Sequence, residues 1–278
     1  MGLYTRDRYK LLLNVNQFPH YPRILIEGDS WTDHPFVANI AWVLHLYLGR
    51  RVHILNISCI GDLIANIGNK DERQFKLLED VLGRRAYDFD LLFLSGGGND
   101  LLANSDVNLK LNKVLKEGTG DDPENYMDLP KLEQILTSIK DAYTAILDMA
   151  SDVNSDMPAL AHNYDFIYPR NAGVDIIIDN IKGPWIYPEM CKKHITDQTI
   201  QKSITDYMLH AFNPVLNELK QAHSNFDFVD TQNTLPKHSG PWTDDIRYWD
   251  DEIHPNSKGF NMLVEKRIGP AIEAILDN

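Results

Sequence analysis

Short, mainly apolar runs alternate along the chain with longer segments whose apolar residues recur at helical spacing. An apolar run without polar interruptions is typical of a strand that is buried on both faces, as in a parallel sheet. Such runs predict strands at 21–27, 51–57, 89–95, 157–167 and 226–229. Helical spacing predicts helices at 36–48, 64–82 with an interruption around Gly68 and Asn69, 132–150, 197–223 with Pro214 near a kink, and 256–276.

This alternation predicts the α/β fold class, in which about five parallel strands form a sheet with helices on both faces. No repeat and no Pro/Gly/Ser-rich linker divides residues 1–278, so we expect one three-layer α/β/α domain. The polar segment 103–129 holds Gly118, Gly120 and Pro123, and is predicted to be an excursion of loop with some helix. In such sheets a ligand binds beyond the carboxyl ends of the strands, so the residues that follow each strand are the candidates for a functional site.

The composition is that of an ordinary globular protein, with 43% hydrophobic and 24% charged residues. A formal net charge of −13 argues against binding to nucleic-acid phosphates or to an anionic membrane surface, because both require clustered Lys and Arg. No apolar run approaches the ~18 residues of a membrane-spanning helix. The segment 1–20 lacks the apolar stretch of a signal peptide. The default expectation is a cytoplasmic protein, although a processed secreted chain would look the same.

The cysteines and histidines give no metal-binding pattern. Cys59 and Cys191 lie far apart without a Cys or His companion, which predicts neither a disulfide scaffold nor a zinc site; one disulfide between them stays open. His162 and His194 have no Asp, Glu or Cys at ligand spacing. The glycine run at 95–100 lacks the ending of a P-loop and the last glycine of a dinucleotide-binding loop. We therefore expect no metal and no nucleotide cofactor.

Residues suited to nucleophilic catalysis follow the first and the last predicted strand. Ser30 comes just after the first strand, and His254 lies beyond the last one. A serine hydroxyl becomes an effective nucleophile when a base lies within hydrogen-bonding reach and a carboxylate orients that base. Asp251 precedes His254 by three residues, so one tight turn could bring its carboxylate to the imidazole. The flanking acids Asp250 and Glu252 are alternatives for this role.

Hydrogen-bond donors for an oxyanion follow two other strands. Gly61, after the second strand, offers a backbone N–H that a ligand can approach closely because no Cβ blocks it. Asn99, after the third strand, offers a side-chain amide, although it could instead support the turn after Gly98. Removal of one such donor typically costs a factor of ~100–1,000 in rate.

Together these segments resemble the sequence blocks of the SGNH hydrolases, also called the GDSL esterase/lipase superfamily. Residues 28–31 (GDSW) stand where this family commonly has GDSL, and Gly61 matches the glycine of its second block. Residues 97–100 (GGND) match its GxND block, and 251–255 (DEIHP) match its DxxHP block. Each block alone is weak, but four in the family's order are specific. Trp31 departs from the family's Leu, at a position that we expect mainly to pack.

The resemblance implies a flavodoxin-like three-layer fold and the hydrolysis of a carboxylic ester or thioester through an acyl-enzyme, without a cofactor. It implies that Ser30 is the nucleophile and also gives the first oxyanion N–H. Gly61 and Asn99 would be the other two donors. His254 would be the base and Asp251 the residue that orients it. The partner would be a small-molecule, lipid or glycan ester.

Two segments, 103–129 and 170–196, exceed the length of a minimal member of this family, and we expect them to form a wall or lid of the substrate site. Aromatic residues in the predicted loops either form a stacking platform for an acyl chain or sugar, or pin long loops to the body. These residues are Trp185, Tyr187, Trp242, Tyr248 and Trp249.

Three polar residues near the blocks have structural explanations. Asp29 is expected to bond the backbone of its own turn, and Asp100 to cap a helix or brace a loop. His34, four residues past Ser30, could line the pocket, but it is expected at the surface.

Other functions stay open at this point. On the same scaffold, a carbohydrate O-acetylesterase and a lysophospholipase are alternatives to a simple esterase. In another class, the chain could be a catalytically inert module that binds an acyl or glycan ligand.

Overall fold

The computed structural model describes residues 2–34, 38–49, 51–102, 104–105, 108–109, 113–173, 183–238 and 246–277. A six-stranded parallel sheet with the strand order β1-β3-β2-β4-β7-β8 forms its centre. The strands are β1 (Gly2–Thr5), β2 (Arg23–Gly28), β3 (His53–Asn56), β4 (Leu91–Ser95), β7 (Ala159–His162) and β8 (Phe226–Val229).

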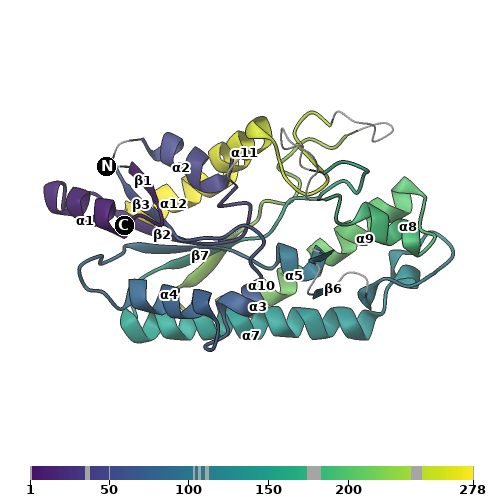
Figure 1. Ribbon diagram of the computed structural model, residues 1–278, viewed down its shortest axis with the longest axis horizontal. Coiled ribbons are helices and arrows are strands. Elements are labelled where there is room, and N and C mark those ends of the chain that lie inside the picture. The colour runs from purple at the N-terminus through teal and green to yellow at the C-terminus, as the bar shows by residue number, and fades with distance from the viewer. Residues whose placement is uncertain are drawn as a thin grey trace.

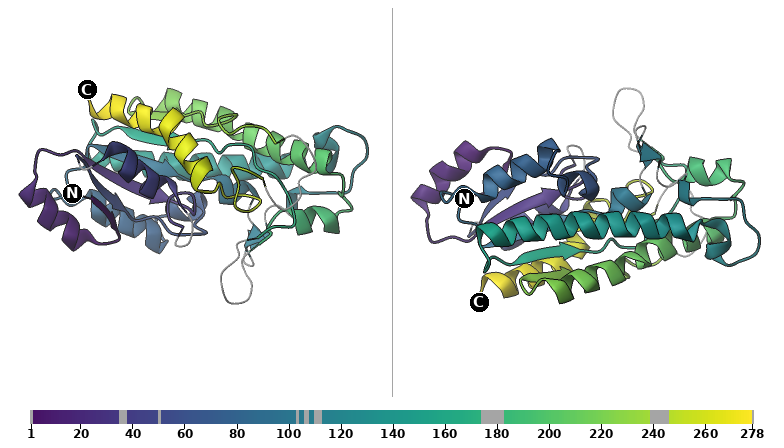
Figure 2. Two further views of the ribbon diagram at one scale, coloured as in Figure 1. Left: turned by 90° about the horizontal axis from the view of Figure 1, so that it is seen from above. Right: turned by 90° about the horizontal axis from the view of Figure 1, so that it is seen from below.

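Helices cover both faces of the sheet (Figure 1), and the two views of Figure 2 show the covering layers from above and below. One face carries α2 (Ile40–Leu48), α11 (Ser257–Leu263), a π-helical turn (Val264–Ile268) and α12 (Gly269–Leu276). The other face carries α3 (Ile64–Ile67), α4 (Arg73–Leu82), α7 (Leu129–Val153) and α10 (Phe212–Ala222). The predicted three-layer α/β fold is confirmed.

The remaining elements lie at the N-terminus and beyond the carboxyl ends of the strands. They are α1 (Arg8–Gln17), α5 (Gly98–Leu102), β5 (Asn104–Ser105), β6 (Asn108–Leu109), a 3₁₀ helix (Pro123–Tyr126), α8 (Tyr187–Lys192) and α9 (Gln198–His210). The antiparallel pair β5–β6 and the 3₁₀ helix lie in the segment that was expected to be loop with some helix.

The N-terminal strand and helix are not predicted by the apolar pattern. In β1 only Tyr4 is buried, and the strand pairs with β3 at the edge of the sheet. In α1 only Leu11 and Val15 are buried. An edge strand needs little apolar surface, so no apolar run marks it. The sheet therefore has six strands where about five were expected.

The strand predicted at 157–167 is too long, because β7 ends at His162. The backbone N–H of the next residue, Asn163, still donates to the Val229 oxygen at 3.2 Å, and its side chain ties together the segments that follow β7 and β8. Its side-chain N–H donates to Asp230 at 2.8 Å, and its side-chain oxygen accepts from the Thr231 N–H at 2.6 Å. The residues that follow therefore lie at the carboxyl edge of the sheet rather than within it.

Two predicted helix interruptions are confirmed. The segment 64–82 contains two helices, since α3 ends at Ile67 and α4 begins at Arg73. The segment 197–223 also contains two, with Ala211 between α9 and α10. Pro214 lies in the first turn of α10, where its missing N–H leaves no hydrogen bond unmade.

Candidate active site

Ser30 lies in a tight turn that follows β2. The last residue of this strand, Gly28, approaches β4 so closely that a Cβ on it would lie 2.2 Å from the carbonyl oxygen of Ser95. The Asp29 N–H donates to the same oxygen at 2.9 Å. Only glycine permits this approach, so the turn is held directly against β4. Within it Ser30 is 4% exposed.

The structure brings the three proposed catalytic side chains into one hydrogen-bonded chain. His254 Nε2 lies 2.8 Å from Ser30 Oγ, and His254 Nδ1 lies 2.6 Å from Asp251 Oδ2. The other carboxylate oxygen of Asp251 accepts the backbone N–H groups of Ile253 and His254, both at 2.7 Å. A carboxylate beside Nδ1 places the ring proton there, which leaves Nε2 able to accept a proton from Ser30.

Trp31 joins the two loops that carry these residues. It is 4% exposed, and its indole N–H donates to the backbone oxygen of Ile253 at 3.1 Å. Its ring packs against Tyr164 and Phe260, with centroid distances of 4.8 and 5.6 Å. The expectation that this residue mainly packs is confirmed.

Of the two predicted oxyanion donors, Gly61 lies in the loop after β3 and Asn99 lies in the first turn of α5. Gly61 has φ = 82°, a conformation that favours glycine, and no atom lies within 4 Å of where its Cβ would be. Asn99 is 8% exposed, and one of its amide hydrogens is donated to the backbone oxygen of Asp62 at 3.0 Å. Because an amide has two hydrogens, Asn99 can hold this loop and still donate to a ligand.

Beside Ser30 lies a small cavity of ≈ 20 Å³, close to the space that one water molecule needs. Its walls combine the turn that carries Ser30, the start of α5 and several apolar side chains from beyond the carboxyl ends of the strands. The lining residues are Asp29, Ser30, Trp31, Gly98, Asn99, Leu102, Tyr164, Ile167, Leu209 and Ile253.

The structural expectations for two acidic residues are confirmed. Asp29 accepts the Trp31 N–H at 3.0 Å, within its own turn. Asp100 accepts the N–H groups of Ile64 and Ala65 at 2.8 and 3.2 Å, so its carboxylate caps the first turn of α3.

The expectation that His34 lies at the surface is wrong. His34 is 5% exposed, and its ring meets the His254 ring edge to face at 5.0 Å. Burial, together with the charge of His254, lowers the pKa of His34 to about 4, so the ring is neutral near pH 7. The alternative that His34, four residues past Ser30, lines the pocket agrees with this burial. A neutral ring here shields one side of the His254 imidazole from water.

Glu252 does not contact the imidazole but holds another wall of the site. Its carboxyl oxygens accept the backbone N–H groups of Trp185, of Ile186 at 2.6 Å and of Tyr187 at 3.1 Å, while burial raises its pKa to about 8. The Trp185 ring in turn packs edge to face on the His254 ring at 5.5 Å. These partners lie far from Glu252 in the sequence, so sequence analysis could not assign this role.

The predicted loop aromatics have different environments. Trp249 is 3% exposed and packs against Trp31, as a residue that pins its loop to the body, whereas Trp185 faces the site. Trp242 lies outside the described residues. So do parts of both predicted insertions, namely 103, 106–107, 110–112 and 174–182.

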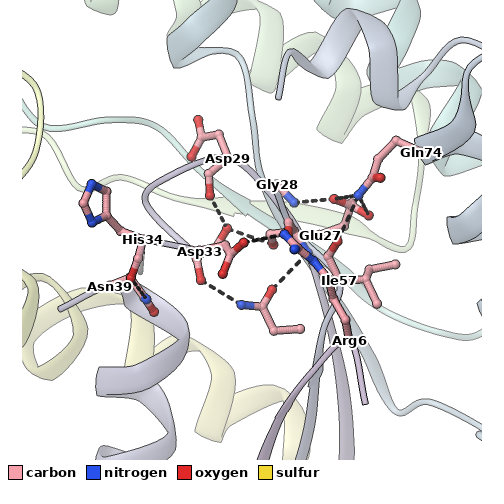
Figure 3. Close-up of polar contacts among 12 residues, drawn as sticks. Arg6, Glu27, Gly28, Asp29, Asp33, His34, Asn39, Ile57 and Gln74 are labelled. Atoms are coloured by element: carbon pink, nitrogen blue, oxygen red, sulfur yellow. Dashed lines mark hydrogen bonds and ion pairs between the residues drawn. The ribbon is translucent and has the colours of Figure 1, made fainter. Parts of the chain in front are cut away.

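Arg6 connects the unpredicted strand β1 to the nucleophile loop. Its guanidinium lies beside Asp33 (Figure 3). One guanidinium nitrogen donates to Asp33 Oδ2 and to the backbone oxygen of Ser58, each at 2.6 Å. Asp33 follows Ser30 by three residues. The N-terminal strand thus supports the loop that carries the candidate nucleophile.

A buried carboxyl, Glu27, lies directly behind this loop. One of its oxygens accepts the Gly28 N–H at 2.8 Å, and the Gln74 amide lies 3.0 Å from both oxygens and 2.9 Å from the backbone oxygen of Ile57 (Figure 3). Burial raises the pKa of Glu27 to about 8 against the effect of these bonds. The side chain is therefore neutral near pH 7.

The protein is expected to lose stability as the pH rises toward 8, partly because of Glu27. The pKa of about 8 in the folded protein exceeds the unfolded value of ~4.3, so the unfolded chain releases this proton first. The stability due to neutral Glu27 is complete below pH ~4.3 and is lost as the pH rises through 8. In Glu27→Gln, the fall in the free energy of unfolding between pH ~4.3 and 8 should be smaller by roughly 3–5 kcal/mol. Urea unfolding at several pH values measures it. Glu133 is exposed, so Glu133→Gln is the control. Equal slopes of unfolding free energy against pH in the two variants would contradict the prediction.

Further expectations concern the cysteines, metals and membrane segments. Cys59 and Cys191 are both free thiols, so the disulfide left open by the sequence does not form. Within the described residues, no group of three or more His, Cys, Asp or Glu side chains could hold a metal ion. The described helices include none with both the length and the apolar character needed to cross a bilayer.

Comparison with known proteins gives a fold and a family. No curated protein sequence matches the chain. The lipase Lip_vut3 from a goat rumen metagenome has a TM-score of 0.53 and 14% identity, over 91% of this chain and 97% of that one. A carbohydrate esterase family 3 protein from Talaromyces cellulolyticus has a TM-score of 0.51 and 14% identity, over 92% and 99%. Phospholipase A1 from Streptomyces albidoflavus NA297 has a TM-score of 0.51 and 12% identity, over 88% and 98%.

At sequence identities of 12–14%, the structural similarity to these three proteins shows a shared fold. A family model of the GDSL-like lipases and acylhydrolases matches residues 26–261, a span that contains all four motif segments. Since this match covers most of the chain, the protein belongs to the GDSL-like lipase/acylhydrolase family.

Proposed function

We propose that the protein is a serine esterase that hydrolyses a carboxylic ester through an acyl-enzyme on Ser30. The observation that carries the proposal is the hydrogen-bonded chain from Ser30 Oγ through His254 to the buried Asp251, with contacts of 2.8 and 2.6 Å. Membership of an acylhydrolase family supports it. An inert binding module would need neither a base aligned on a serine nor a buried carboxylate behind that base.

In the acylation step, Ser30 Oγ attacks the ester carbonyl carbon while His254 Nε2 takes its proton. Asp251 stabilises the imidazolium that forms. The negative charge on the former carbonyl oxygen is stabilised by N–H groups of three residues, Ser30, Gly61 and Asn99. The intermediate collapses when the imidazolium protonates the leaving alcohol.

Deacylation repeats these steps with water as the nucleophile. His254 Nε2 takes a proton from the water as its oxygen attacks the acyl carbon, and then returns a proton to Ser30 Oγ. The carboxylic acid leaves and the starting site is restored. Neither step calls for a metal ion or a cofactor.

The cavity beside Ser30 favours a short acyl group. Its ≈ 20 Å³ has room for a methyl group, and the apolar side chains of Leu102, Ile167 and Leu209 line it. The structure thus favours the O-acetylesterase alternative over lysophospholipase activity. The alcohol part of the substrate would point away from this cavity.

Hydrolysis of p-nitrophenyl esters from acetate to palmitate tests the function. We expect kcat/KM to be highest for acetate and to fall by at least ~10-fold by octanoate, because each added methylene must displace a packed wall. Leu209→Ala should enlarge the cavity and move the optimum to longer chains, whereas Leu219→Ala, an equal truncation in the α10 core, should not. An octanoate optimum in the wild type would contradict the short acyl group. Hydrolysis of no ester would favour the inert binding module.

A further inference from the structure

Glu252 is a buried carboxyl on the loop of the candidate base, and the proton transfers of the esterase mechanism do not use it. It lies between Asp251 and His254 in the sequence and is 0% exposed. The carboxyls of Asp251 and Glu252 have different partners. Asp251 bonds to His254 and to backbone N–H groups of its own loop, whereas Glu252 bonds to a segment that lies 65–67 residues away.

Three consecutive backbone N–H groups, those of Trp185, Ile186 and Tyr187, converge on the Glu252 carboxyl. They precede and open α8, where N–H groups have no partner within the helix. The residue before this helix, Ile186, supplies no side-chain cap and is 0% exposed, so water cannot replace a lost partner there. Glu252 therefore caps α8 from a distant loop.

The place of the Trp185 ring depends on this stretch of backbone. The ring meets the His254 ring edge to face, at a centroid distance of 5.5 Å and an interplanar angle of 79°. It also lies close over Gly183, where a Cβ would come within 2.8 Å of it. Gly183 has φ = 91°, a conformation that favours glycine. The conformation of residues 183–187 thus directs the ring onto His254.

The rotamer of His254 depends on what surrounds its ring. Backbone contacts set where the loop lies, but a side chain still turns about its own χ angles. His34 and Trp185 both pack on the imidazole, with centroid distances of 5.0 and 5.5 Å. Without the Trp185 ring, the imidazole would have space to turn away from Ser30, and water could enter beside it.

We propose that Glu252 is a positioning residue that acts on ester hydrolysis through Trp185. It holds the backbone of residues 185–187 and so keeps the Trp185 ring against His254, with Nε2 aimed at Ser30 Oγ. The inference rests on the proposed roles of Ser30 and His254. A displacement of the base by about 1 Å can cost a factor of ~100 in rate, so a contact outside the proton path can control kcat.

A double-mutant cycle tests whether Glu252 acts through Trp185. Glu252→Ala and Trp185→Ala should each lower kcat for p-nitrophenyl acetate by ~10–100-fold, with KM within ~3-fold of the wild type. Because both substitutions remove the same contact with the base, the double variant should lose no more than ~3-fold beyond the slower single variant. Losses that multiply would overturn the proposal, and so would a wild-type kcat in either single variant.

Two further variants keep the test valid if Glu252→Ala does not fold. Gly183→Ala leaves the Glu252 carboxyl in place but puts a methyl group where the Trp185 ring lies, so it should lower kcat as Trp185→Ala does. Glu252→Gln keeps an oxygen for the N–H groups. Because burial raises the pKa of Glu252 to about 8, a neutral amide is a close substitute, and kcat should stay within ~5-fold of the wild type. A wild-type kcat in Gly183→Ala, or a loss of more than ~10-fold in Glu252→Gln, would overturn the proposal.

Asp197→Ala is the matched control. Asp197 is exposed, and its carboxyl caps the next helix, α9, through the N–H groups of Thr199 and Ile200 at 2.7 and 3.2 Å. The substitution removes a helix cap of the same kind from a place with no contact to His254, so kcat should equal that of the wild type. A loss equal to that of Glu252→Ala would overturn the proposal, since any loosened helix start would then suffice.

Proton NMR gives a measurement that does not depend on turnover. The Nδ1 proton of His254, in its 2.6 Å contact with Asp251, should give a sharp low-field resonance in the wild type and in Asp197→Ala. In Glu252→Ala and Trp185→Ala it should broaden through exchange with water. An unchanged resonance in these two variants would overturn the proposal. A wild type that hydrolyses no ester would instead contradict the proposed function, while the resonance still decides whether Glu252 holds the imidazole.

Discussion

Ser30→Ala is expected to lower kcat/KM for p-nitrophenyl acetate by at least ~10⁴-fold without changing the fold. The substitution removes the oxygen that forms the acyl-enzyme and leaves the backbone N–H and the other oxyanion donors in place. A residual rate above that in water is expected, because binding and oxyanion stabilisation persist. Ser30 lies in a turn held by Gly28 and Asp29 through backbone contacts with β4, so loss of its hydroxyl should leave the thermal unfolding midpoint close to that of the wild type.

A second serine gives the control for this measurement. Ser203 lies on α9, and its hydroxyl bonds only one turn back, to the backbone oxygen of Thr199. Ser203→Ala should hydrolyse the ester at the wild-type rate. A fluorophosphonate probe should label the wild type and Ser203→Ala at Ser30, and should not label Ser30→Ala. Unchanged turnover in Ser30→Ala, or a label on another residue, would contradict the proposed nucleophile.

The central strands could be predicted because burial on both faces leaves a direct mark on the sequence. In β4 every residue from Leu91 to Ser95 is buried, and in β3 all four residues are buried. The edge strand β1 has no such mark, since one buried residue suffices for it. The carboxyl end of β7 was misplaced for a different reason. There the side chain of Asn163 bonds to Asp230 and Thr231, which follow β8, and these bonds do not alter the apolar pattern.

In the site, two kinds of contact could be predicted: the pairing of Ser30 with His254, from motif segments at strand ends, and the pairing of residues that are close in sequence. Asp251 and His254 are three residues apart, so a turn brings them together. The contacts of Glu252 with residues 185–187 depend on how distant loops pack, and so does the burial of His34 against His254. No spacing rule can identify such residues. A buried position for a polar residue is visible only once the fold is known.

These distant contacts hold the histidine loop from three sides. Trp31 donates to the backbone oxygen of Ile253, and Arg170 donates to those of Asp250 and Asp251 at 2.9 and 3.2 Å. Glu252 binds the segment that follows the cis Gly183–Pro184 bond. The imidazole is therefore positioned by backbone contacts on its own loop, while its chemistry is set by Asp251. Because different groups position the imidazole and tune it, removal of the Asp251 carboxylate should lower the rate strongly and change the structure of the loop little.

Asp251→Asn is expected to lower kcat by ~10⁴-fold while KM changes little. Asn has nearly the same shape and keeps an oxygen that can accept the N–H groups of Ile253 and His254. Its amide nitrogen then faces His254 Nδ1 and donates to it, so the ring proton moves to Nε2. In this tautomer Nε2 points an N–H at Ser30 Oγ and can no longer accept the serine proton. The rate should therefore fall because the base has the wrong tautomer, not because the loop unfolds.

Asp250→Asn is the matched control, since it neutralises the adjacent carboxylate on the same loop. Asp250 is exposed and contributes its backbone N–H and oxygen to the loop, which the substitution leaves intact. Its kcat should stay within ~3-fold of the wild type, because an exposed charge is screened by water and salt. Equal losses in Asp250→Asn and Asp251→Asn would mean that the loop responds to its total charge. A large loss confined to Asp251→Asn, with ¹⁵N shifts of His254 that report a proton on Nε2, would assign the effect to the tautomer of the base.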